Sequence, residues 1–133
     1  DFKMRDISKN LLAVISIDPQ TISSDTTTNG VGVDVRDYDA AMVVFQSNDA
    51  VTDGDFALKI QESDDDVTYT DVDSSEQVGT LADFTSSNEG SQQGGYLGNK
   101  RYVRPVITST STSCGGIFMA SVIAGLPHNA PTS

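Results

Sequence analysis

Tryptophan is absent from this chain, and cysteine and histidine each occur only once among its 133 residues. The single cysteine, Cys114, cannot form an intrachain disulfide, and its neighbours are serine and glycine rather than a base that would activate the thiol. The single histidine, His128, lies between Pro127 and Pro131, where nothing orients it beside a nucleophile. We therefore expect that the chain is not an enzyme.

Metal and phosphate motifs are missing as well. The sequence has no cluster of cysteine and histidine at zinc spacing and no glycine-rich loop between a strand and a helix. No apolar run approaches the roughly 20 residues that cross a bilayer. The longest runs are Leu11–Ile15 and Ala40–Phe45. These gaps predict that the chain uses no cofactor and has no membrane partner.

Positive charge is scarce and unevenly placed. Eight lysine and arginine residues stand against 19 aspartate and glutamate residues, which gives a net charge of −11. Nucleic acid is therefore an unfavourable partner, because proteins bind its phosphates by neutralising them with lysine and arginine. Six of the eight bases fall in two short stretches, Lys3–Lys9 and Lys100–Arg104. A partner protein with acidic groups would be attracted to these two places and repelled elsewhere.

Apolar periodicity predicts strands and almost no helix. Apolar residues alternate with polar or small ones in Val31–Val35 and Phe56–Ile60, as in a strand with one buried face. Three continuous apolar runs predict strands that are covered on both faces or that lie at a subunit contact. These runs are Leu11–Ile17, Ala41–Phe45 and Ile117–Ala124. A short buried helix is the alternative for the first run.

Turn signals at short spacing separate seven to nine such segments and predict one all-β domain, a β-sandwich or jelly roll. We place this domain at residues 10–125, between a charged N-terminal arm (1–9) and an extended C-terminal arm (126–133) that contains two prolines. The polar stretch Thr80–Gly95 predicts a long surface loop or hairpin extension. Because proline cannot donate to a β-ladder, the strand that contains Pro105 should lie at a sheet edge or carry a bulge.

The most specific local pattern is a turn centred on three consecutive aspartates, Asp64–Asp66. It resembles the Asp-box turns of sialidase-like β proteins at Ser63, Asp65 and Thr68, with Tyr69 in the aromatic place and Val67 where the pattern has glycine. The resemblance implies a structural turn whose serine and aspartate side chains accept backbone N–H bonds. A Ca²⁺ site is the alternative, although three adjacent carboxylates cannot all face one ion.

Arginine, lysine and tyrosine gather in Gly94–Ile107, and arginine and tyrosine are enriched among the residues that dominate binding energy at interfaces. We predict that this stretch and the N-terminal arm form a protein interface. Its expected residues are Phe2, Lys3, Arg5, Tyr96, Lys100, Arg101, Tyr102 and Arg104. The alternative is a basic strand that only offsets the acidic surface of the same chain.

Five stretches in order along the chain resemble a family of small structural proteins of tailed bacteriophages. They are Asn29–Asp34, Tyr38–Val43, Gln61–Asp65, Gly95–Arg104 and Gly125–Pro131. The resemblance implies a virion component. We expect a decoration, or cement, protein that binds the outer surface of the head and stabilises its lattice.

The expected partner is the major capsid protein, with self-association between copies on the particle. The expected location is the virion, assembled in the cytoplasm of the bacterial host. Two alternatives stay open. One is a head–tail connector or tail protein, and the other is a carbohydrate-binding β-sandwich module, which the absence of tryptophan for stacking on sugars weakens.

Overall fold

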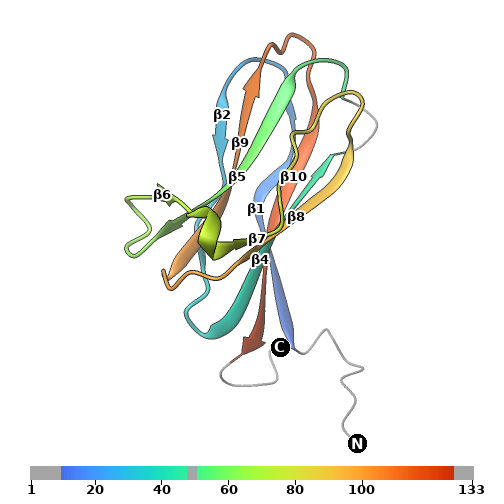
Figure 1. The fold of residues 1–133 in the computed structure, drawn as a ribbon. Helices are drawn as coiled ribbons and strands as arrows, with labels where there is room; N and C mark the ends of the chain where they lie inside the picture. Colours follow the sequence, from blue (N-terminus) through green and yellow to red (C-terminus); the bar gives the residue numbers. More distant parts are fainter. Residues whose placement is uncertain (1–9, 48–50, 128–133) are drawn as a thin grey trace, which may run out of the picture.

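Ten strands and one short 3-10 turn make up the computed structural model, which describes residues 10–47 and 51–127 (Figure 1). The strands are β1 (Leu11–Ile22), β2 (Thr27–Asn29), β3 (Val33–Asp34), β4 (Tyr38–Ser47), β5 (Asp55–Ser63), β6 (Thr70–Asp71), β7 (Gln77–Val78), β8 (Gly90–Tyr96), β9 (Tyr102–Thr110) and β10 (Gly116–Pro127). The 3-10 turn is η1 (Ser74–Glu76). In the described part of the chain, no helix is long and apolar enough to span a bilayer.

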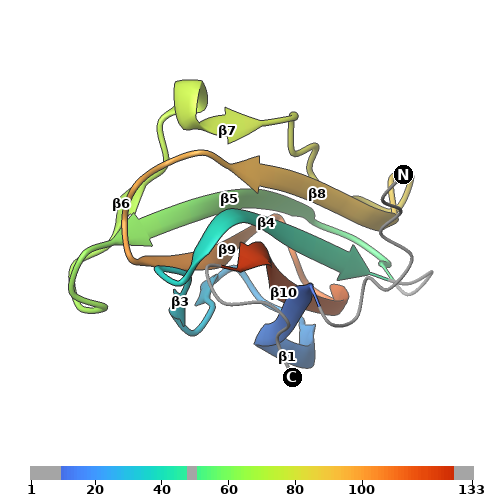
Figure 2. The same ribbon diagram turned by 90° about the horizontal axis from the view of Figure 1, so that it is seen from below.

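The strands form two antiparallel sheets that pack face to face (Figure 2). The first sheet has the order β1-β10-β4-β8-β7, and the second has the order β2-β9-β5-β6, with β3 also paired to β9. Hydrogen-bonded partners are nested along the chain: β1 pairs with β10, β2 and β3 with β9, β4 with β8, and β5 with β6. Successive pairs alternate between the sheets. This nesting is the topology of a jelly roll, so the predicted fold class is confirmed.

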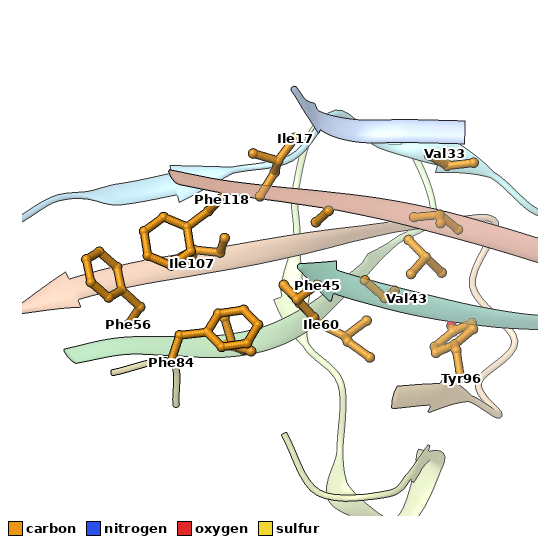
Figure 3. Packing of buried hydrophobic residues seen from close by; sticks show 14 of the residues in the cluster. Ile17, Val33, Val43, Phe45, Phe56, Ile60, Phe84, Tyr96, Ile107 and Phe118 are labelled. Atoms are coloured by element: carbon orange, nitrogen blue, oxygen red, sulfur yellow. The ribbon is translucent and has the colours of Figure 1, made fainter. Parts of the chain in front are cut away.

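The core lies between the sheets and is rich in phenylalanine (Figure 3). Rings of Phe56 and Phe118 lie 4.2 Å apart between centroids, and Phe84 stacks 5.9 Å from Phe118. Alternation along β5 sends Phe56, Leu58 and Ile60 into this core, as the sequence predicts. The strand expected at Val31–Val35 is shorter in the structure, where β3 covers only Val33 and Asp34. Val31 precedes this strand and is 69% exposed.

The first apolar run is a strand, as expected, and the alternative of a helix is wrong. It begins β1, which stands at the edge of the first sheet and pairs there with β10. Coverage on both faces is also wrong for this run, because Leu11 is 40% and Ile15 54% exposed. The other interpretation of this run, a subunit contact, stays a prediction.

The loop prediction for Thr80–Gly95 is wrong in two places. Phe84 is completely buried and bridges Phe56, so the polar stretch is anchored at its middle by one aromatic ring. Gly90–Tyr96 is strand β8, paired with β4. The sheets approach closely there, since a Cβ on Gly94 would lie 3.2 Å from Ile60 Cδ1 of the other sheet. The small residues that suggested a loop therefore allow close packing of the two sheets.

Pro105 lies in β9, which is not the outermost strand of its sheet, so the predicted edge position is wrong. The physical reason for the prediction still applies, because proline has no backbone N–H to donate to a neighbouring strand. β2 ends opposite Val106 and β3 begins opposite Val103, so Pro105 faces the break between them. Its carbonyl accepts a hydrogen bond from the Gly30 N–H at 2.8 Å, and no donor is needed at this position.

The two ends of the described chain lie on neighbouring strands at one end of the sandwich. The N-terminal arm (1–9) lies outside the described residues. β10 continues to Pro127, which pairs with Tyr38, so the first two residues of the expected C-terminal arm belong to the sheet. The rest of that arm, including His128, also lies outside the described residues.

Candidate functional site

Of the predicted interface residues, Phe2, Lys3 and Arg5 lie outside the described residues. Tyr96 is a core residue, because its side chain is only 6% exposed. Its hydroxyl donates to Glu62 Oε1 at 2.7 Å and accepts from the Lys100 backbone N–H at 2.9 Å. Burial, together with the Glu62 carboxylate, raises the pKa of Tyr96 above its ordinary range. The prediction that Tyr96 is an interface anchor is therefore wrong for this fold.

The basic side chains of this stretch already have partners within the chain. Lys100 Nζ lies 2.8 Å from Asp64 Oδ2, and Arg101 donates from Nη2 and Nε to Asp34 Oδ2 at 2.8 and 3.1 Å. The Arg101 guanidinium also lies 5.0 Å from the ring centroid of Tyr102. Its hydrogen bonds lower the pKa of Asp34, and the Asp64 carboxylate raises the pKa of Lys100.

Arg104 joins this network without an acidic partner. Its Nε and Nη2 donate to Gln61 Oε1 at 3.0 and 2.7 Å, and its guanidinium lies 3.9 Å over the ring of Tyr69. The Tyr69 hydroxyl in turn donates to Asp66. Burial and this hydrogen bond raise the pKa of Tyr69 above its ordinary range. Stacked arginine and tyrosine thus form a surface layer across β9 and the aspartate turn.

We call the outer surface of the second sheet the charged face. Its cross-strand neighbours mix charge and hydrogen-bonding groups: Gln61 lies between Arg104 and Asp71, and the Lys59 ammonium pairs with Asp71 at 3.2 Å. Further residues of this face are Asn29, Asp34, Ser63 and Tyr102. Because Lys59 and Arg101 are matched by acids of the same chain, this face fits the alternative in which the basic strand offsets local acidic charge.

An open cavity of about 360 Å³ at one end of the sandwich brings Tyr96, Lys100 and Arg101 together. Arg36, Tyr38, Asp39 and Asn99 are also among its lining residues. Hydrogen-bond donors and acceptors both line this cavity, and the half-buried Tyr38 lies among them. It therefore suits a neutral, hydrogen-bonding ligand better than a strongly charged one.

The outer surface of the first sheet differs sharply from the charged face. We call it the uncharged face, because none of its side chains in the cross-strand rows of the described strands bears a charge. The rows are Leu11–Gly125–Ala40, Ala13–Ile123–Met42–Gly95–Val78 and Ile15–Ser121–Val44–Gln93. Ile15 and Val78 are each 54% exposed, and Met42, Val44 and Ile123 are half-buried.

A shallow apolar hollow of about 200 Å³ continues this face at the end remote from the termini. Pro19, Gln46, Ile117 and Met119 line it, together with Ser47 and Phe118. Ser47 Oγ is buried and has no hydrogen-bond partner in the described chain. The apolar runs in β4 and β10 therefore reach a surface that no other described element covers, and the subunit contact that the sequence suggests for these runs stays a prediction.

The aspartate turn has the hydrogen bonds of a structural turn. Ser63 Oγ accepts from the N–H groups of Asp65 and Asp66 at 3.2 and 3.0 Å, and Asp65 Oδ1 accepts from Val67 and Thr68 at 2.9 Å each. The Thr68 and Val67 donors lower the pKa of Asp65. The left-handed residue is Asp66, with φ of 62°, rather than Val67 in the place of glycine. Across the described residues, no group of three or more acidic, cysteine or histidine side chains could hold a metal ion.

Sequence reasoning missed a second carboxylate hub, at the opposite tip of the sandwich. Asp53 accepts from Ser113 Oγ at 2.6 Å and from the N–H groups of Ser113, Cys114 and Gly115. These donors, with the serine hydroxyl first, lower the pKa of Asp53 strongly. No local pattern shows this pairing in the sequence, because the partner loop is 60 residues away along the chain. Cys114 is exposed beside this hub.

Comparison with protein families finds no match, and no curated protein matches the sequence. Among solved structures, a chain from "Structure of infectious bursal disease virus Gx strain" aligns with a TM-score of 0.46 and 12% identity. The alignment covers 90% of this chain and 32% of that one. The functional proposal therefore rests on the surfaces of the molecule itself and on its sequence motifs.

Proposed function

We propose that this chain is a structural protein of a virus particle, and specifically a decoration protein of a tailed-phage head. It binds the outer surface of the capsid and stabilises the lattice through many equivalent contacts. In this proposal the partner is the major capsid protein, the place of action is the virion, and the particle is assembled in the cytoplasm of the bacterial host. The chain acts by binding and not by catalysis.

The observation that carries the proposal is the uncharged face. The chain has a net charge of −11, yet three cross-strand rows of its first sheet have no charged side chain. Charged residues are depleted at the cores of protein interfaces, because burying an unpaired charge is costly. A broad uncharged sheet on a strongly acidic molecule is therefore suited to being covered by a partner, while the acidic remainder faces solvent.

Two further features support a particle protein. Five sequence stretches resemble small phage structural proteins, and four of them lie wholly within the described residues. Jelly rolls are common in viral capsid proteins, although lectins and other proteins share the fold. Docking through the uncharged face differs from the docking predicted from the sequence, in which the basic strand contacts the partner. Binding through the uncharged face should change little with salt concentration, since few charges are neutralised on contact.

The test is a decoration assay on capsids of the encoding phage assembled without this protein. Gln93→Glu places one charge on the uncharged face, and Gln61→Glu makes the same isosteric change on the charged face. We expect Gln93→Glu to weaken capsid binding at least about tenfold, because an unpaired charge is buried on docking. Gln61→Glu should bind as the wild type does. Equal affinity of both variants, or selective loss in Gln61→Glu, would overturn the proposed docking face.

A connector or tail protein would use the same face but would be present in about a dozen copies rather than hundreds. Quantitative mass spectrometry of purified particles separates these cases. The cavity beside Tyr38 favours a second candidate, a carbohydrate-binding module, because Asp39, Asn99 and Arg36 could hydrogen-bond sugar hydroxyls next to an aromatic ring. Glycan binding that Tyr38→Ala abolishes, without any capsid binding, would favour that candidate.

A further inference from the structure

The two sheets have four edges, and three of them end in very short strands. β7 and β6 have two residues each, while β2 and β3 contribute three and two residues to the same edge of the second sheet. Short edge strands are one way in which proteins prevent unwanted pairing with other chains. The fourth edge is β1, which has 12 residues and is the long edge among the described strands.

β1 itself has two unlike halves. In the second half, the register shifts twice against β10, between Ile15 and Ile17 and between Ile17 and Gln20, and this part contains Asp18 and Pro19. Bulges, charges and prolines all discourage edge pairing. At the middle of the strand, the Ser16 carbonyl accepts from the Val31 N–H at 3.0 Å, so another loop covers the edge there.

Among the described residues, the segment Leu12–Ile15 has none of these protections. Leu12–Ile15 contains no charge, proline or glycine, and it pairs with β10 in regular register. Its outward side chains Ala13 and Ile15 begin two of the three rows of the uncharged face. A regular, apolar edge segment of this kind is a ready template for another strand.

We propose that the first half of β1 pairs antiparallel with the same segment of a second copy of the chain, about a two-fold axis at Ala13 that places Leu12 of one copy opposite Val14 of the other. The two first sheets then join into one sheet, and their uncharged faces form one continuous surface. This inference deepens the proposed function, in which copies lie side by side on a capsid, and it rests on that function only for its biological setting.

A second copy can occupy this edge, because the segment bears no charge and can pair with itself about a two-fold axis. Two molecules of charge −11 repel each other, and this segment is a place where they meet without bringing acidic side chains together. A two-fold contact of identical segments closes on itself and forms no open filament.

The test uses the free protein without capsids, so its failure is distinguishable from a failure of capsid docking. Residues directly opposite in an antiparallel pair have Cβ atoms about 4.5–5.5 Å apart, close to disulfide range. In a Cys114→Ser background, Ala13→Cys should therefore form a covalent dimer under mild oxidation at least about ten times faster than Thr21→Cys. Thr21 is an exposed residue in the protected half of the same strand and provides the matched control.

A second pair of variants tests the same contact without cysteine. Analytical ultracentrifugation should show a wild-type dimer that dissociates on dilution. Ala13→Glu should shift it to monomer, since two like charges face each other at the axis. Gln93→Glu adds the same charge to the same face, away from the edge, and should leave the dimer intact. A wild-type monomer at all concentrations, or equal cross-linking of Ala13→Cys and Thr21→Cys, would overturn the inference, including in favour of a strand from another protein at this edge.

Discussion

The outer faces of the two sheets differ in their side chains, although both sheets are built from antiparallel strands. One face carries charged side chains and the other carries none in its cross-strand rows. On the charged face, Arg101 pairs with Asp34, Lys59 pairs with Asp71, and Arg104 stacks on Tyr69. On the uncharged face, Met42, Val44 and Ile123 stand in rows without one charged neighbour. The first face has satisfied its charges internally, while the second has apolar groups that no described element covers.

This difference shows that bases clustered in a sequence can be matched by acids that the fold brings close. Exposed ion pairs contribute little to stability or to binding, because solvent screens them. On an acidic protein, a broad face without charge stands out, because its residues differ from the acidic residues on the rest of the surface. Such a patch is therefore a better candidate for a binding surface.

The largest expected effect compares neighbouring valines on one strand. Val43 is completely buried in the core, and Val44 points to the uncharged face. We expect Val43→Ala to lower the free energy of unfolding by about 2 kcal/mol, because it leaves a cavity between the sheets. Val44→Ala should cost clearly less stability but weaken capsid binding. Urea denaturation and the decoration assay measure the two effects, and equal stability losses would contradict the assignment of faces.

The charged face is tested by the double variant Arg101→Glu, Arg104→Glu. Reversing these charges removes the pair with Asp34 and the stack on Tyr69, so the melting temperature should fall by several degrees. Capsid affinity should stay at the wild-type level, because the charged face is predicted to point to solvent. Scanning calorimetry and the decoration assay provide the readouts. A folded double variant that no longer decorates would restore the basic strand as the docking surface.

A smaller loss is expected at the aspartate turn beside the charged face. Asp65→Ala removes the acceptor for the Val67 and Thr68 N–H groups, so the melting temperature should fall by a few degrees. Chelator should change nothing in the wild type, since the carboxylate already serves backbone donors. Strong stabilisation by added Ca²⁺ that Asp65→Ala abolishes would show a metal site instead.

The smallest effect concerns acid stability through Asp53. Its pKa in the fold is below the ordinary value of 3.8, so the ionised carboxylate stabilises the folded state above that pH. This stabilisation is lost as the pH falls below 3.8 toward the pKa of the folded state. Asp53→Asn should therefore melt below the wild type at neutral pH, and the difference should shrink in strong acid. A difference that is constant with pH would exclude this linkage.

Local patterns were enough to predict much of the fold. Alternation in Phe56–Ile60 and the two-sided apolar runs in β4 and β10 predicted real strands, and the turn around Asp65 follows from side chains a few residues apart. These features depend on neighbours in sequence, so a single sequence contains the information. The jelly-roll class follows from the number and spacing of such strands.

The proposed docking surface depends on contacts between distant residues and is therefore harder to predict from the sequence. Arg101 and Asp34 are 67 positions apart, and the partner of Lys100, Asp64, is 36 positions away. Charge clusters therefore looked unmatched in sequence. The uncharged face becomes visible only when the register places Ile123 beside Met42 and Ala13. Tyr96 was misplaced because nothing local shows that its hydroxyl meets Glu62 in the core.

The most direct test of the central claim is an electron cryomicroscopy map of capsids decorated with the wild-type protein. The orientation of the sandwich on the shell can be read from such a map. We predict that β10 and β4 face the capsid and that Arg101, Arg104 and Tyr69 face solvent. A map in which the charged face meets the shell, while Met42 and Val44 remain open to solvent, would contradict this account.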